Sequence, residues 1–94
     1  SHSTPELNIN VDDENKFLII ERFARECSLD GNKVTIDGLR IEFENGWGLL
    51  RASNTTPKLV LRFEGNTKEA LNSIKTDFLN ELKRICPEID VTLH

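Results

Sequence analysis

Near its middle the chain carries the stretch Gly46-Trp47-Gly48-Leu49-Leu50-Arg51-Ala52-Ser53-Asn54-Thr55-Thr56-Pro57. Its first half alternates between two sets of side chains, as a β-strand does, and its second half is polar and ends at a proline. A second alternating run, residues 59–63, follows directly. The stretch therefore predicts two neighbouring strands joined by a polar loop.

The polar loop is rich in groups that bind anions. Between residues 51 and 56 it holds one guanidinium, three hydroxyl groups and one carboxamide, and no carboxylate. Arg51 offers a planar fork of N–H donors that matches phosphate or carboxylate. Ser and Asn favour turns in which their side chains bond nearby backbone and leave other N–H groups pointing outward. Residue types alone leave two interpretations open, an anion-binding loop and the commoner solvated hairpin loop.

The same stretch resembles the phosphate-binding loop in the C-terminal domain of bacterial phosphomannomutases/phosphoglucomutases, the α-D-phosphohexomutase family. The resemblance covers nearly the whole chain. It includes the family's entry into that domain (residues 3–6, Ser-Thr-Pro-Glu), its characteristic strand (37–43, Asp-Gly-Leu-Arg-Ile-Glu-Phe) and the strand after the loop (59–64). In phosphoglucosamine mutases the corresponding loop is similar to Arg-Pro-Ser-Gly-Thr-Glu-Pro, whereas this chain has Ala52, Asn54 and Thr56. That difference favours the mannose/glucose branch.

The resemblance implies a mechanism for a parent enzyme. A phosphoserine on the first domain, with magnesium beside it, donates its phosphoryl group to a glucose or mannose 1- or 6-phosphate. The resulting bisphosphate reverses, and its other phosphate returns to the serine. The C-terminal domain holds the phosphate that is not reacting. By the family's motif, the residues that bind it here are Arg51, Ser53, Asn54, Thr55 and, at a position that varies among branches, Thr56.

The chain lacks the other motifs of such an enzyme. It has no Thr-Ala-Ser-His-Asn-Pro phosphoserine loop, no Asp-Gly-Asp-x-Asp-Arg metal loop and no Gly-Glu-x-Ser-Gly sugar loop. None of its serines has an apparent activating base. We therefore expect no catalytic residue and no metal ligand in this chain, and no activity from it alone. Its expected partners are a phosphosugar and the other three domains of the parent. A free-standing sugar-phosphate-binding module and an inert structural domain are the alternatives.

Periodicity predicts an α+β fold in the order β-α-β-β-β-β-α. The expected architecture is an antiparallel sheet of four to five strands with two amphipathic helices packed on one face. The resemblance implies the same arrangement, similar to the TATA-box-binding-protein-like class. The expected elements are a strand at 7–11, a helix at about 13–27, strands at 33–37, 39–43, 47–52 and 58–64, a helix from Asn66 to Pro87 and an optional strand at 89–93.

Several local features of these elements are also predicted. Asp12 or Asp13 would cap the first helix, whose apolar stripe would be Phe17, Ile20, Ala24 and Cys27, with Phe23 widening it. Asp37-Gly38 and Asn45-Gly46 would form two-residue hairpin turns. Asn66 would cap the second helix, with Leu71, Ile74, Phe78, Leu82 and Ile85 as its stripe. Trp47 is expected to anchor a strand in the core or at an edge.

Length and composition limit the possible roles. Ninety-four residues with 37% hydrophobic and 30% charged side chains make one folded domain, assigned to residues 7–94. Residues 1–6 are a linker or a cloning remnant, and rotation about Thr4–Pro5 would close the domain over substrate. The net charge of −4 disfavours nucleic-acid and membrane binding. Cys27 and Cys86 are expected to be buried, reduced thiols, which favours a cytoplasmic protein.

Overall fold

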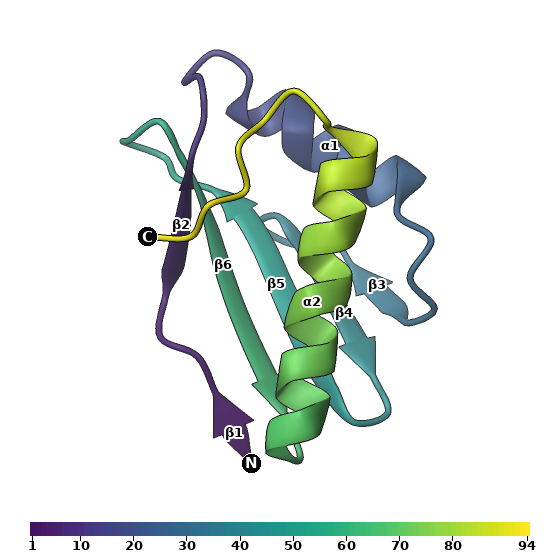
Figure 1. Ribbon diagram of the computed structural model, residues 1–94. Coiled ribbons are helices and arrows are strands. Elements are labelled where there is room, and N and C mark those ends of the chain that lie inside the picture. The colour runs from purple at the N-terminus through teal and green to yellow at the C-terminus, as the bar shows by residue number, and fades with distance from the viewer.

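The computed structural model describes residues 1–94 and consists of one antiparallel sheet and two helices (Figure 1). The elements are β1 (His2–Ser3), β2 (Leu7–Asn10), α1 (Lys16–Glu26), β3 (Asn32–Val34), β4 (Leu39–Phe43), β5 (Gly46–Ala52), β6 (Lys58–Gly65) and α2 (Lys68–Ile85). The sheet has six strands in the order β1-β6-β5-β4-β3, and β2 also pairs with β6. The predicted α+β class is confirmed, with one short strand, β1, more than expected.

The two faces of the sheet differ in what covers them. Leu50 pairs with Leu61, and Gly48 with Phe63, so these residues share the inner face, which α2 crosses (Figure 1). A side chain at Gly48 would lie 2.5 Å from the Phe78 ring of α2, so only glycine fits there. Arg51 belongs to the opposite, outer face.

Both helices contribute to one core with the inner face. The predicted stripe of α2 is largely confirmed, because Ile74, Phe78, Leu82 and Ile85 are buried. The Phe78 ring contacts Phe63 of the sheet at 5.3 Å and Phe23 of α1 at 5.5 Å between centroids. Neither helix is long and apolar enough to cross a membrane.

The prediction for α1 was wrong about its start and about Phe17, whereas Phe23 and Cys27 are buried and Ile20 and Ala24 pack against the core as expected. The helix begins at Lys16 after Asn15, so neither Asp12 nor Asp13 caps it. Its buried positions are Lys16, Ile19, Phe23 and, just past its end, Cys27. Phe17, placed in the core from its spacing, is 56% exposed. Residues 17–20 are all apolar, so the sequence is compatible with more than one buried face of the helix. The buried face in the structure includes Lys16.

Both hairpin turns and the second helix cap are shifted from the predicted positions. Val34 pairs with Arg40 and β4 begins at Leu39, so residues 35–38 form a longer loop in place of a two-residue turn. Ile36 is consequently 82% exposed instead of lying in a strand. Phe43 pairs with Gly46, which puts the next turn at residues 44–45. Thr67 caps α2, accepting a hydrogen bond from the Ala70 N–H at 3.0 Å, and Asn66 does not.

Trp47 lies half-buried on the outer face and does not enter the core. The Arg40 guanidinium stacks on its ring, 4.3 Å from the centroid, and also pairs with Glu42. A guanidinium over an indole face is a favourable cation–π contact. Because β5 is flanked by β4 and β6, the ring lies on the outer face of a central strand, and the expected anchor in the core or at an edge is wrong.

Both ends of the chain lie against the sheet. Thr4 donates its N–H to the Phe63 carbonyl at 3.0 Å, and its hydroxyl accepts from the Phe63 N–H at 3.1 Å. Rotation about Thr4–Pro5 would break these bonds, so this dipeptide is not a free hinge. At the other end no strand forms, but His94 and Asn8 exchange two backbone hydrogen bonds of 2.8 and 3.2 Å.

Candidate functional site

The polar loop joins β5 to β6 at the end of the sheet nearest α1. Pairing between the two strands ends at Ala52 and Leu59. The Ser53 N–H then donates to the Lys58 carbonyl at 3.0 Å and closes the base of the loop. The sequence was therefore correct in predicting a strand–loop–strand unit here.

The Ser53 hydroxyl oxygen is the hydrogen-bonding centre of the loop. It accepts the Thr56 N–H at 3.2 Å and, more weakly, the Thr55 N–H at 3.4 Å, and its oxygen lies 2.7 Å from the Thr56 hydroxyl oxygen, with which it shares a hydrogen bond. A hydroxyl oxygen has two lone pairs and one hydrogen. Because one hydrogen serves the bond between the Ser53 and Thr56 hydroxyls, the other hydroxyl hydrogen of this pair is left to donate to a group outside the loop.

Arg51 enters the site from the outer face of β5. Its side chain is half-buried and forms neither an ion pair nor a hydrogen bond within the chain. All five ion pairs of the molecule involve other residues, none of them in the loop. The guanidinium therefore keeps its donors available, in an otherwise acidic chain.

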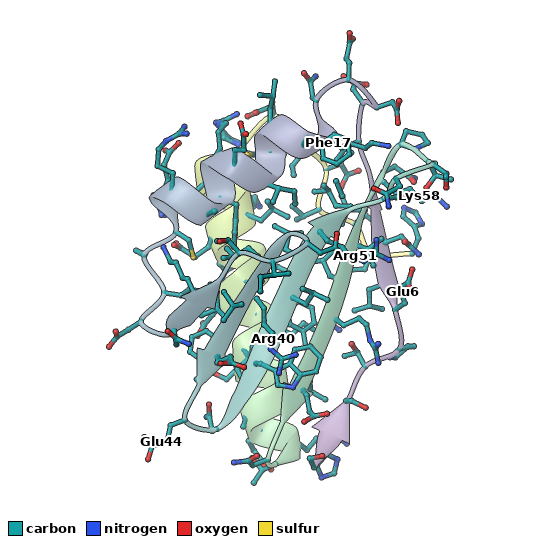
Figure 2. All side chains as sticks on the ribbon, turned by 180° about the vertical axis from the view of Figure 1, so that it is seen from behind. Glu6, Phe17, Arg40, Glu44, Arg51 and Lys58 are labelled. Carbon is teal, nitrogen blue, oxygen red and sulfur yellow. The ribbon has the colours of Figure 1, made fainter.

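A cavity of about 280 Å³ lies between α1, the β3–β4 loop and the end of β5. Phe17, Arg51 and Lys58 gather at this end of the sheet, whereas Arg40 lies further along the outer face (Figure 2). The cavity is lined by Phe17, Ile20, Glu21, Ala24, Thr35, Asp37, Gly38, Arg51, Ala52 and Asn54. Of the five residues predicted for the site, Arg51 and Asn54 line this cavity. Ser53, Thr55 and Thr56 instead bond to one another in the adjoining loop.

Gly38 brings the β3–β4 loop directly against Arg51. Its φ of 100° lies in the region that favours glycine. A side chain there would place its first carbon 2.6 Å from both the Arg51 Cβ and the Leu50 carbonyl oxygen. The sequence identified Asp37-Gly38 as a turn and as the start of the family's characteristic strand, but not as a neighbour of Arg51. Its contact with Arg51 depends on the register of β4 and β5, which turn signals do not give.

Lys16 is the other residue that sequence reasoning missed. It is 3% exposed, and its ammonium donates to the Thr56 carbonyl at 3.0 Å and pairs with the Asp13 carboxylate at 2.8 Å. A second anchor runs from the Val11 N–H to the Pro57 carbonyl at 3.1 Å. Its burial could have been inferred from helical spacing, because Lys16 lies three residues before Ile19 and therefore on the same face of α1.

No other cluster in the molecule suggests catalysis or metal binding. Burial raises the pKa of the Cys27 and Cys86 thiols, both of which are free. Hydrogen bonds from Arg84 and Ser28 lower the pKa of Glu81 to about 2, but this carboxylate lies between the helices. No group of three or more His, Cys, Asp or Glu side chains is placed to hold a metal ion.

Comparison with known proteins identifies the family. Residues 6–81 match the family described as phosphoglucomutase/phosphomannomutase, C-terminal domain. The chain is 52% identical over 90 residues to a phosphomannomutase/phosphoglucomutase from Pseudomonas aeruginosa, covering 95% of this chain and 19% of that protein. It is 51% identical over 81 residues to a phosphoglucomutase from Neisseria meningitidis, covering 83% of this chain and 18% of that protein.

A solved structure agrees with the sequence matches. The crystal structure of a phosphoglucomutase/phosphomannomutase family protein from Burkholderia thailandensis superposes with a TM-score of 0.83 at 42% identity. The match covers 96% of this chain and 19% of that one. This chain thus spans about a fifth of the length of the relatives that it matches. It belongs to the phosphoglucomutase/phosphomannomutase family, in which it corresponds to the C-terminal domain.

Proposed function

We propose that this domain binds the non-reacting phosphate of a hexose phosphate while a parent phosphohexomutase interconverts 1- and 6-phosphosugars. The observation that carries the proposal is the unpaired Arg51 guanidinium beside a loop in which one hydroxyl hydrogen of the Ser53–Thr56 pair is left to donate. Asn54 lines the same cavity as Arg51, and Thr55 is the next residue of the loop. Thr56 acts within this proposal mainly by orienting Ser53.

The physical requirements of a mutase fit such a loop. A phosphate far from the reacting centre supplies binding energy that orients the sugar where the chemistry occurs. Hydrogen bonds to a charged group contribute roughly 1.5–3 kcal/mol each, so a few donors give substantial affinity. A loop that contacts only phosphate also accepts the sugar in either of its two orientations.

The rest of the reaction belongs to the parent in this proposal. The parent is an intramolecular phosphotransferase of the isomerase class, located in the cytoplasm, with a phosphoserine on its first domain. The magnesium that the resemblance implies is assigned in this proposal to the phosphoserine domain of the parent. Glucose and mannose 1- and 6-phosphates are the expected substrates, and the other three domains are the expected partners.

A titration of the ¹⁵N-labelled domain with glucose 1-phosphate, followed by NMR, tests the proposal. We expect amide shifts centred on Ser53 to Thr55 and a dissociation constant of about 1 mM or weaker, since the domain supplies few sugar contacts. Arg51→Ala should abolish these shifts and leave the remaining spectrum folded. Lys68→Ala removes the same charge from an exposed position at the start of α2 and should bind normally.

Two results would argue against the assignment. If the wild-type domain gave no loop shifts at high ligand concentration, the loop would be inert in the isolated domain. If Arg51→Ala bound as the wild type does, the guanidinium would not be the phosphate ligand. Equal losses in Arg51→Ala and Lys68→Ala would indicate a general effect of net charge.

A further inference from the structure

The ammonium of Lys16 is buried beneath the polar loop with only two strong partners. One is the Asp13 carboxylate, whose own side chain is 68% exposed, and the other is the Thr56 carbonyl in the loop. A buried charge is costly unless it is paired and hydrogen-bonded. Since Asp13 could pair with an exposed lysine equally well, the inward position of Lys16 is accounted for by its bond to the loop.

Thr56 transmits this contact to the centre of the loop. Its carbonyl accepts from the Lys16 ammonium at 3.0 Å and from the Lys58 N–H at 2.8 Å. Its own N–H donates to the Ser53 hydroxyl oxygen, and its hydroxyl shares a hydrogen bond with the Ser53 hydroxyl. One residue therefore joins α1 on one side to the Ser53 hydroxyl at the centre of the loop on the other. A shift of the Thr56 peptide would break both of its bonds to Ser53.

We propose that Lys16 is a positioning residue for phosphate binding, which it supports through the Thr56 carbonyl without touching the ligand. The effect of Lys16 on phosphate affinity rests on the proposed function. Its effect on the order of the loop does not, and can be tested without a ligand. The Val11–Pro57 bond gives the loop a second anchor, so the loss of Lys16 should loosen the Thr56 end without detaching the loop.

The first test needs no ligand. Backbone ¹⁵N relaxation should give order parameters near 0.85 for Ser53 to Thr56 in the wild type, falling below about 0.6 in Lys16→Met. Amides of β4 and α2 should be unchanged in the same variant. If the loop stays as rigid in Lys16→Met as in the wild type, the proposal is wrong. Lys16→Gln, which keeps a polar but shorter side chain, replaces the methionine variant should that one fail to fold.

Asp13→Asn separates loop positioning from the ion pair. It removes the carboxylate partner but leaves the Lys16–Thr56 bond. We expect rigid loop amides and an affinity for glucose 1-phosphate within about twofold of wild type, whereas Lys16→Met should weaken binding about tenfold. Equal effects of the two substitutions would show that the ion pair matters, and would overturn the proposal.

The two proposals fail in distinguishable ways. If the wild-type domain does not bind glucose 1-phosphate, the proposed phosphate binding is wrong. The relaxation comparison still decides whether Lys16 orders the loop. A loosened loop in Lys16→Met with undiminished affinity would show that Lys16 orders the loop but does not position it for phosphate, and would overturn the inference alone.

Discussion

The Glu81 carboxylate joins the two helices. It accepts hydrogen bonds from the Ser28 N–H at 2.6 Å, the Ser28 hydroxyl at 2.8 Å and the Arg84 guanidinium at 2.8 and 2.9 Å. These bonds, those from Arg84 above all, hold the pKa of Glu81 at about 2 although its burial acts in the opposite direction. The ionised form is therefore the one that the fold stabilises.

The depressed pKa of Glu81 predicts loss of stability in acid. Its contribution is complete above its ordinary pKa of 4.5 and is lost as the pH falls from there toward about 2. At about 1.4 kcal/mol per pKa unit, the shift from 4.5 to about 2 gives an upper limit of about 3.5 kcal/mol for this contribution. Glu81→Gln should lower the free energy of unfolding at pH 7 and flatten its decline below pH 4.5. Urea unfolding at several pH values measures this, with Asp77→Asn on the exposed side of α2 as the control. If the free energy of unfolding of Glu81→Gln fell as steeply below pH 4.5 as that of the wild type, the stabilising role of the Glu81 carboxylate would be wrong.

Single residues also mark how far sequence reasoning could reach. The resemblance to the family's loop predicted Arg51 as a phosphate ligand, whereas residue types alone left the role of the loop open, and the assignment stays a prediction. Lys16 and Glu81 were missed because hydrophobic patterning assigns charged residues to the surface. Their inward positions depend on partners 40 and 53 residues away, namely Thr56 and Ser28.

Among the secondary-structure elements, strands were easier to predict than turns. The alternation in β5 and β6 allows only one assignment of side chains to the inner and outer faces, because a shift of the pairing by one residue would exchange the two faces. Asp37-Gly38 does occupy the left-handed region, with φ of 54° and 100°, as its turn signal indicates. The surrounding loop is nevertheless longer than predicted, since pairing resumes only at Val34 and Arg40. The turn residues thus predicted where the chain reverses direction, but not the length of the loop or the register of β3 and β4.

The β3–β4 loop provides a test of how closely it fixes Arg51. Gly38→Ala adds a carbon that would overlap the Arg51 Cβ and the Leu50 carbonyl at a positive φ. We expect a loss of roughly 1–3 kcal/mol in stability, together with displaced Arg51 amide signals and weaker phosphosugar binding. Urea unfolding and NMR spectra measure these effects. Asp37→Gly, at the neighbouring position of positive φ, should leave the stability nearly unchanged. Equal losses at both positions would argue against a specific contact of Gly38 with Arg51.

The whole molecule is a sheet with helices on one face; the N-terminal end pairs with β6, and the C-terminal end bonds to β2. Its single core and its α+β layers were predictable from alternation and helical stripes. The pairing of β1 and the position of the C-terminal tail were not, because short terminal segments carry too little pattern. Ile89, Val91 and Leu93 nevertheless pack against the core.

The tail should therefore contribute to global stability. Deleting residues 89–94 exposes part of the core and removes the two bonds between Asn8 and His94, while Glu88 remains to pair with Arg22. From the apolar area concerned we expect a loss of roughly 2–4 kcal/mol. Urea unfolding of the full chain and the truncated chain measures this difference. An unchanged transition midpoint would show that the tail lies on the core without stabilising it.

The anchoring of the loop also has a consequence for how the chain reaches its working form. The contact between Lys16 and Thr56 spans 40 positions, so it cannot form until the first helix has docked on the assembled sheet. Contacts of such separation close slowly, and they are unavailable to a collapsed but incompletely packed chain. The proposed capacity to bind an anion should consequently appear late during refolding, after the helices and the central hairpin are in place. Stopped-flow experiments with a phosphosugar would then report completion of the native state more strictly than circular dichroism does.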